Sequence, residues 1–431
     1  MNIKNREFLR KINPKQFQTK NFKGALSLLA GNTISKAILT IGGLFLANWY
    51  GPESYGVYSV FLSYIVILPA LSSLQLDNIL MLQKGSTEVR NVFSGTILVT
   101  AFLTFLIISV VFALNAFGII SVPLPPFVLF LCGVGGILTG WNLSQNAMFT
   151  KYKLFNQIST AFILASSFSV GFQFLFYALG WKENGLIYGW LVGLFASFLY
   201  NLRVSKDRWR RVDFPSFKES IREHKNIVKY QYTSTAINTV ANNILPVLVI
   251  LYFGKLEVGV YALSMKILST PLVLMASSVS KIYFQKSVQL YYHNRKGLQR
   301  LTHKVCLSSF LVILVFVILI NTLGIHILEM IFSGDEWVGL RKYTLILSIW
   351  ILSRSAINPI TNIMVVINRN QYSLIFNVYL LIVNSIAIYV GVYFNSFEYC
   401  LYIFAGFSSL GYFTQLIAIL IDLNTLAKNE K

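Results

Sequence analysis

Long apolar runs dominate the chain and recur at a spacing that fits helices crossing a membrane. About 20 consecutive apolar residues span the hydrocarbon layer as an α-helix. Twelve such windows occur, at 25–47, 56–76, 93–115, 123–142, 158–180, 185–202, 230–252, 258–280, 305–328, 343–366, 373–394 and 399–421. The pattern therefore predicts an all-α membrane protein with twelve transmembrane helices.

Composition supports this fold class. The 431 residues are 55% hydrophobic and 12% charged, whereas a soluble globular protein carries about 25% charged residues. The basic segment 1–23 is too long and polar for a signal peptide, so we expect the first helix to be retained. The three cysteines and four histidines have no metal-ligand spacing, so the sequence predicts neither a metal site nor a cofactor.

Positive residues alternate between the segments that join the windows. Seven Lys or Arg precede the first window, eight lie in 203–225 and six in 281–304. The segments that follow the odd-numbered windows, which alternate with these basic segments, hold only Lys182, Lys255, Arg341 and Lys342. Because Lys and Arg are retained in cytoplasmic loops, both termini are predicted to be cytoplasmic. Orientation and attraction to anionic membrane lipids account for the net charge of +20, and nucleic-acid binding is disfavoured because no soluble basic domain is present.

A repeated motif divides the chain into two halves. The pattern G-x-x-x-x-G-V-Y occurs at 51–58 and again at 254–261, 203 residues apart and between corresponding windows. We therefore predict a basic N-terminal segment 1–24, a six-helix bundle 25–202, a linker 203–226 that is partly amphipathic helix, a second six-helix bundle 227–421 and a tail 422–431. Two bundles of the same orientation, with the substrate held between them, form a common transporter plan.

Three cations lie inside predicted membrane helices with no carboxylate at the same depth: Lys36, Lys266 and Arg354. A charge at the centre of such a helix costs about 2.5–3.5 kcal/mol on insertion scales. Water in a cavity, neighbouring amides or an anionic ligand would offset that cost. Structural roles remain open: the Lys266 ammonium could extend to the interface, and Arg354 could cap carbonyls freed by Pro359.

Polar residues form stripes on two of the predicted membrane helices. Asn32, Lys36 and Thr40 recur every four residues and share one helix face. Asn238 and Asn242 do the same on the seventh window. Amides suit sugar hydroxyls and cations suit a diphosphate, although such stripes also join helices to one another. The predicted substrate-binding residues are Lys36, Lys266, Arg354, Asn32, Asn238 and Asn242, with no catalytic residue.

The carboxylates nearest the membrane helices lie at predicted helix ends. They are Asp77, Glu329 and Asp422. Their positions favour capping or interfacial roles, and Asp77 is kept as the candidate for ion coupling.

The twelve windows, the basic segment running into Leu28-Leu29-Ala30-Gly31-Asn32 and the 51–58 turn resemble bacterial polysaccharide flippases. These include O-antigen and capsule repeat-unit flippases of the multidrug/oligosaccharidyl-lipid/polysaccharide exporter superfamily. The resemblance implies a V-shaped fold of two bundles with the first, second, seventh and eighth helices lining the cleft.

The same resemblance implies a function. The substrate would be an oligosaccharide on an undecaprenyl diphosphate carrier, moved from the cytoplasmic to the outer leaflet of the bacterial inner membrane by alternating access for cell-surface polysaccharide such as lipopolysaccharide. Implied partners are that lipid-linked oligosaccharide, membrane lipids and polysaccharide polymerase or chain-length machinery.

Two other functions stay open at this point. An ion-coupled multidrug exporter of the same superfamily would commonly use a membrane carboxylate, whereas the predicted polar core here is cationic. An integral membrane enzyme of polysaccharide assembly would need a sizeable outward loop, and every predicted outward loop is short. The sequence thus favours a transporter over an enzyme.

Overall fold

The computed structural model describes residues 14–206, 211–332, 335–367 and 369–428, and these residues contain helices and no strand. The first half consists of α2 (Pro14–Ser72), α3 (Leu76–Leu82), α4 (Ser86–Ala116), α5 (Pro126–Lys151), α6 (Phe155–Ala178) and α7 (Gly185–Ser205). Backbone at Gly51 has φ 76° and ψ 168°, so α2 is in fact two helices joined at a sharp turn. Glycine adopts such positive φ values without steric cost.

A short amphipathic helix, α8 (Phe214–Glu223), leads to the second half. That half consists of η2 (Ile227–Gln231), α9 (Tyr232–Asn243), α10 (Leu245–Tyr252), α11 (Lys255–His293), α12 (Arg295–Leu319), η3 (Ile320–Gly324), α13 (Ile325–Ile331), η4 (Asp335–Trp337), α14 (Leu340–Ile357), η5 (Asn358–Ile360), α15 (Ile363–Val366), α16 (Asn370–Tyr393) and α17 (Phe397–Lys428). The turn before α11 again uses a glycine of positive φ, Gly254 at 99°.

Length and apolarity alone identify nine described helices able to cross a membrane, or ten if the bent pair α9–α10 is one span. One of the nine, Leu26–Ser72, has 47 residues and contains the Gly51 turn, so it covers two of the predicted windows. The chain is a multi-pass membrane protein. The count of twelve spans and the cytoplasmic placement of the termini stay predictions.

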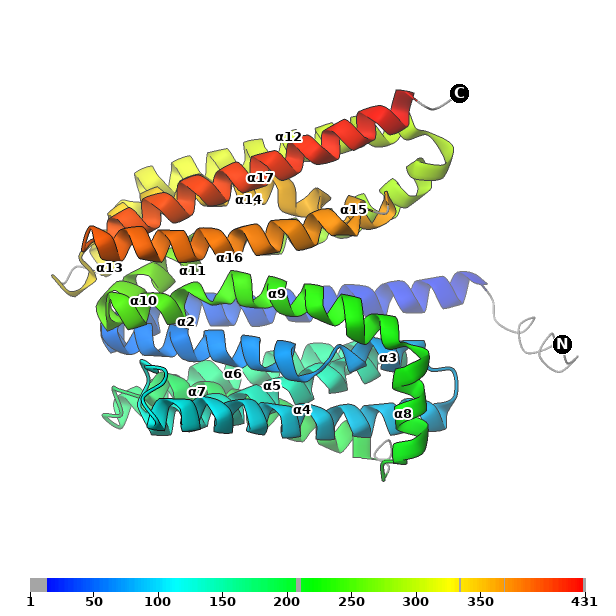
Figure 1. The fold of residues 1–431 in the computed structure, drawn as a ribbon, viewed down its shortest axis with the longest axis horizontal. Helices are drawn as coiled ribbons and strands as arrows, with labels where there is room; N and C mark the ends of the chain where they lie inside the picture. The colour runs from blue at the N-terminus through cyan, green and yellow to red at the C-terminus, as the bar shows by residue number, and fades with distance from the viewer. Residues whose placement is uncertain (1–13, 207–210, 333–334, 368, 429–431) are drawn as a thin grey trace, which may run out of the picture.

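The two halves lie side by side and diverge toward one end (Figure 1). They contact each other where α2 meets α9, α10 and α11. The first described turn of α2, the helix α8 and the end of α17 lie at the end where the halves diverge (Figure 1). The Gly51 and Gly254 turns lie at the opposite end. This agrees with the alternation of positive charge in the sequence, which groups the termini and the linker on one side.

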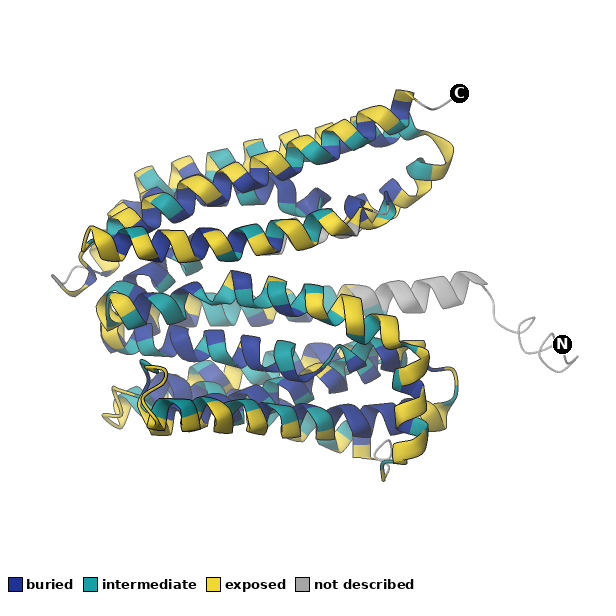
Figure 2. Cartoon of the chain, in the orientation of Figure 1, coloured by how far each residue is buried: buried dark blue, intermediate teal, exposed yellow. Residues whose placement is uncertain are grey.

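Exposed positions follow the outer faces of α12, α16 and α17, and buried positions face inward (Figure 2). Many exposed side chains are large and apolar, among them Phe102, Phe105 and Tyr389, which are 65%, 68% and 71% exposed. Exposure of such an apolar surface to water is unfavourable, whereas its contact with lipid tails is not. The buried residues include many serines, threonines and amides, which suits helices that pack through small and hydrogen-bonding residues in lipid.

Glycines let helices of the first half approach closely. A Cβ on Gly193 would lie 2.4 Å from the Ala165 carbonyl oxygen, and a Cβ on Gly140 would lie 2.5 Å from Thr100. These positions therefore serve close packing of the helices.

The linker helix α8 docks on the first half. Phe217 is buried, and its ring lies against Gly95 of α4. Asn91 donates to the Asp213 carbonyl over 3.0 Å and accepts from the Asp213 N–H over 2.8 Å. The expected amphipathic helix in the linker is thus present.

Candidate functional site

A cavity of about 470 Å³ lies where the two halves meet. Its wall comes from both limbs of α2 and from α6, α7, α9, α10 and α11. The first, second, seventh and eighth predicted windows are therefore all represented, as the resemblance implies for a cleft. Described residues that line the cavity include two lysines and no acidic side chain.

Lys36 is one of the lining cations, on the first limb of α2. The hydroxyl of Thr40, one turn on, donates to the Lys36 carbonyl over 2.7 Å, and Thr40 also lines the cavity. Part of the predicted stripe thus faces the cavity. Asn32, one turn earlier, is half-buried and is not among the lining residues.

Lys266 is the second lining cation and comes from the other half, on α11. Its ammonium occupies the space beside Gly43, because a Cβ there would lie 1.8 Å from Lys266 Nζ. The same nitrogen lies 5.7 Å from the centre of the Tyr55 ring, at cation–π range. Lys266 therefore reaches across to the first half. No described carboxylate forms an ion pair with it.

The predicted asparagine stripe on α9 reaches the cavity at one end. Asn242 lines it, together with Asn243 and Pro246. Asn242 Nδ2 donates to Asn238 Oδ1 over 2.7 Å, and Asn238 is exposed one turn away from the lining residues. Proline at the start of α10 leaves a bend of 40° between α9 and α10. The bend lies beside these amides.

Arg354 does not line the cavity. Its guanidinium lies over the Trp350 ring at 4.8 Å, on the same helix α14. Trp350 and Tyr412 line a smaller pocket together with Tyr261, which is also a residue of the cavity wall. Among the described residues this stacking is the contact seen for the guanidinium, and no carbonyl there accepts a hydrogen bond from it, as the alternative role of capping carbonyls near Pro359 would require. The sequence had grouped Arg354 with the two lysines, and the fold places it behind the wall.

Several lining residues were not predicted from the sequence. Gln173 of α6 is buried and its side-chain amide donates to the Leu186 carbonyl over 2.8 Å. The backbone carbonyl of Gln173 accepts a hydrogen bond from the Tyr50 hydroxyl over 2.7 Å. Ser59 and Ser63, four residues apart on the second limb of α2, also line the cavity. Their spacing was a readable signal, because it places both on one face. A lone glutamine among aromatic residues gave no such signal.

Asp77 lies away from the cavity, on α3 after the second limb of α2 has ended. Its Oδ1 is buried without a hydrogen-bond partner among the described residues. Burial raises the pKa of Asp77 to about 6, and the Ser144 hydroxyl partly opposes that shift. The carboxyl group is therefore near its titration point at neutral pH, which keeps it a candidate for ion coupling.

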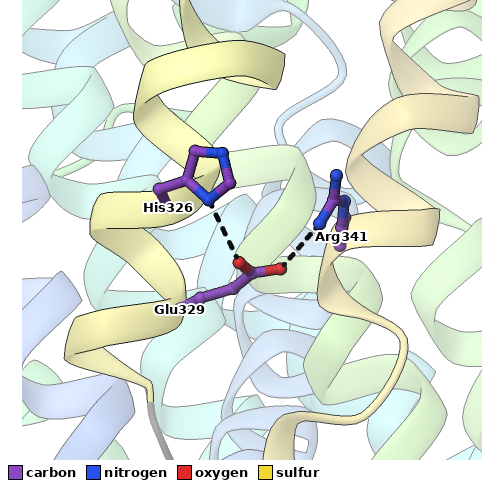
Figure 3. A network of polar contacts seen from close by, with 3 residues as sticks. All are labelled: His326, Glu329 and Arg341. Carbon is purple, nitrogen blue, oxygen red and sulfur yellow. Dashed lines mark hydrogen bonds and ion pairs between the residues drawn. The ribbon is translucent and has the colours of Figure 1, made fainter.

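The other two carboxylates form ion pairs near helix ends. Glu329 contacts Arg341 at 3.5 Å and His326 at 3.6 Å, and all three side chains are exposed (Figure 3). Asp422 pairs with Arg369 at 3.3 Å. Neither carboxylate lines the cavity, and a capping or interfacial role for them stays a prediction.

Solved structures with the same architecture are transporters. An inward-facing multidrug resistance MATE family transporter of the MOP superfamily matches with a TM-score of 0.67 at 13% identity, over 94% of this chain and all of that chain. An outward-facing MATE family transporter matches at 0.59 and 16% identity, over 94% and 96%. A MOP superfamily transporter from Pyrococcus furiosus Vc1, described as having a binding pocket of reverse polarity that suggests a different function, matches at 0.57 and 16% identity, over 94% and 96%.

No curated protein matches the sequence. The profile of the family described as polysaccharide biosynthesis protein matches residues 45–341, which hold most of the cavity wall. Because this profile covers more than half of the sequence, the chain belongs to the polysaccharide biosynthesis protein family, and its fold is that of MOP superfamily transporters.

Proposed function

We propose that the protein is a flippase for undecaprenyl-diphosphate-linked oligosaccharide repeat units, moving them from the cytoplasmic to the outer leaflet of the bacterial inner membrane. The family supplies the link to polysaccharide biosynthesis, and the fold supplies the link to alternating access. Within that frame the diphosphate would enter the cavity, while the prenyl chain stays in the lipid.

The observation that carries the proposal is the charge of the cavity wall. Lys36 comes from the first half and Lys266 from the second, and both line one cavity without a described acidic neighbour in its wall. A diphosphate offers several charge-assisted acceptors to two ammonium groups. The side chains of Thr40, Asn242, Gln173 and the two serines add amide and hydroxyl groups of the kind that bind sugar hydroxyls.

The size of the cavity is consistent with part of such a substrate. Its volume of about 470 Å³ lies within the range of roughly 300–1,000 Å³ common for ligand sites. An exporter of organic cations would place its substrate against the two lysines, which Coulomb repulsion in a low-dielectric site opposes. The cavity therefore favours the anionic lipid-linked substrate.

Replacing Lys36 tests the proposal. The Lys36→Gln protein should reach the membrane and lose export, because one of the two charges facing the diphosphate is gone. Lys36→Arg should retain more export than Lys36→Gln, since it keeps the charge and changes only its shape. The measurement is translocation of lipid-linked oligosaccharide in sealed vesicles. Lys342→Gln is the matched control, since Lys342 is an exposed cation paired with Glu398 outside the cavity. Full export by the Lys36→Gln protein would remove this lysine from substrate binding.

A further inference from the structure

The two repeated turns lie against each other at the end of the molecule where the halves converge. A Cβ on Gly56 would lie 2.2 Å from the Lys255 carbonyl oxygen, and a Cβ on Gly259 would lie 1.9 Å from the Pro52 carbonyl oxygen. Gly56 and Gly259 are equivalent residues of the repeat, and so are Pro52 and Lys255, each pair 203 residues apart. The contact is therefore reciprocal, because the glycine of each turn lies against the carbonyl at the equivalent position of the other turn.

These glycines leave no room for a side chain. An alkyl carbon normally stays about 3.3 Å or more from a carbonyl oxygen, so a single methyl group on Gly259 would force the two turns apart. The contact lies between α2 and α11, which belong to different halves. A pair of halves that rock against each other must break this contact to open that end of the cavity.

Tyr55, next to Gly56, joins the contact to the cavity. Its ring is buried, lies 6.2 Å from the ring of Trp337 and 5.7 Å from Lys266 Nζ. Trp337 and Lys266 both belong to the second half, whereas Tyr55 belongs to the first. The Lys266 ammonium thus contacts Tyr55 of the first turn and also lines the cavity. It fits there because Gly43 has no side chain.

We propose that the two repeated turns form a gate that closes one end of the cavity, and that Lys266 ties the closed gate to the cavity through the Tyr55 ring. Gly56 and Gly259 make the closed state possible, and Gly43 and Tyr55 position Lys266 across the junction. The inference goes beyond the proposed function, because a gate of this kind does not depend on which substrate enters the cavity.

Cysteine labelling in sealed vesicles tests the gate. Cys132, Cys306 and Cys400 are first replaced by alanine, and Ser63→Cys then provides a reporter in the cavity wall. An impermeant thiol reagent is added on the side from which a Lys182→Cys protein is labelled, since Lys182 lies in the α6–α7 loop at the gate end (Figure 1). Defining the side in this way makes the test independent of the predicted topology.

Labelling of the reporter should be slow in the parent and rise several-fold with Gly56→Ala or Gly259→Ala. Gly171→Ala and Gly406→Ala are matched controls, because a Cβ at either position meets nothing within 4 Å, and they should leave the rate unchanged. An unchanged rate in a Gly259→Ala protein that is present in the membrane would overturn the gate.

The contact between Lys266 and the Tyr55 ring is tested with variants of these two residues. The proposal can therefore be tested even if a glycine variant fails to fold. Tyr55→Leu and Lys266→Gln should each raise reporter labelling, whereas Tyr55→Phe keeps the ring and should not. Equal rates for Tyr55→Leu and Tyr55→Phe would overturn the role of the ring. No substrate is present in these assays, so their failure would leave the export test of Lys36 unaffected, and failure of that test would leave the gate unaffected.

Discussion

At the scale of single residues, the buried carboxyl group of Asp77 makes stability depend on pH. Its pKa is raised from 3.8 to about 6 by burial, so the folded protein binds this proton more tightly than the unfolded chain does. The stabilising contribution is fully present below pH about 4 and is lost as pH rises through 6. The difference amounts to about 3 kcal/mol, at 1.36 kcal/mol per pKa unit.

Asp77→Asn should therefore remove this pH dependence. We expect the melting temperature of the detergent-solubilised variant to exceed that of the parent at pH 8 and to approach it at pH 4.5. The asparagine carries no charge at either pH, which is the physical reason. Melting curves at the two pH values provide the measurement. A parent protein that gains stability relative to the variant between pH 4.5 and 8 would contradict the assignment.

At the scale of elements, the segments that join the helices separate into two groups at opposite ends of the molecule. Helix α8 and the start of α12 lie at the end where the halves diverge, and the α6–α7 and α10–α11 turns lie at the other end (Figure 1). The positive-charge alternation predicts that the first end is cytoplasmic. We expect a cysteine in place of Lys182 or Lys255 to react with an impermeant reagent on intact cells.

A cysteine in place of Arg222 or Arg295 should stay protected until the membrane is opened. Arg222 lies on α8 and Arg295 begins α12. Reaction of the Arg222→Cys protein on intact cells would overturn the predicted orientation, although the fold and the gate would be unaffected.

At the scale of the whole molecule, the placement of charge indicates how transport could be driven. The lining cations belong to the protein, so a translocated diphosphate would carry its negative charge outward. With the cell interior negative, each charge gains about 2.3 kcal/mol per 100 mV, or roughly 4–5 kcal/mol for two charges. We expect flipping in sealed vesicles to follow an imposed membrane potential. Transport that follows a pH gradient and ignores the potential would contradict this and make Asp77 the coupling residue.

The apolar windows of the sequence were enough to determine two features, the all-helical fold and its location in a membrane. Apolar windows must lie in lipid and must satisfy their backbone groups as helices, so these features depend on composition and local order alone. The glycines at 51 and 254 were readable for the same reason, since a tight turn with positive φ selects glycine locally.

Tertiary structure decided which polar residues meet. Lys36, Lys266 and Arg354 were equivalent in the sequence, yet only the two lysines line the cavity, and Arg354 lies on the Trp350 ring. Gln173 joins the wall, and Gly43 and Tyr55 meet Lys266, although these residues lie on different helices of the first half and the lysine lies in the second. Helix periodicity fixes the face on which a side chain lies, but the partner facing it depends on the rotation and contact of helices distant in the chain.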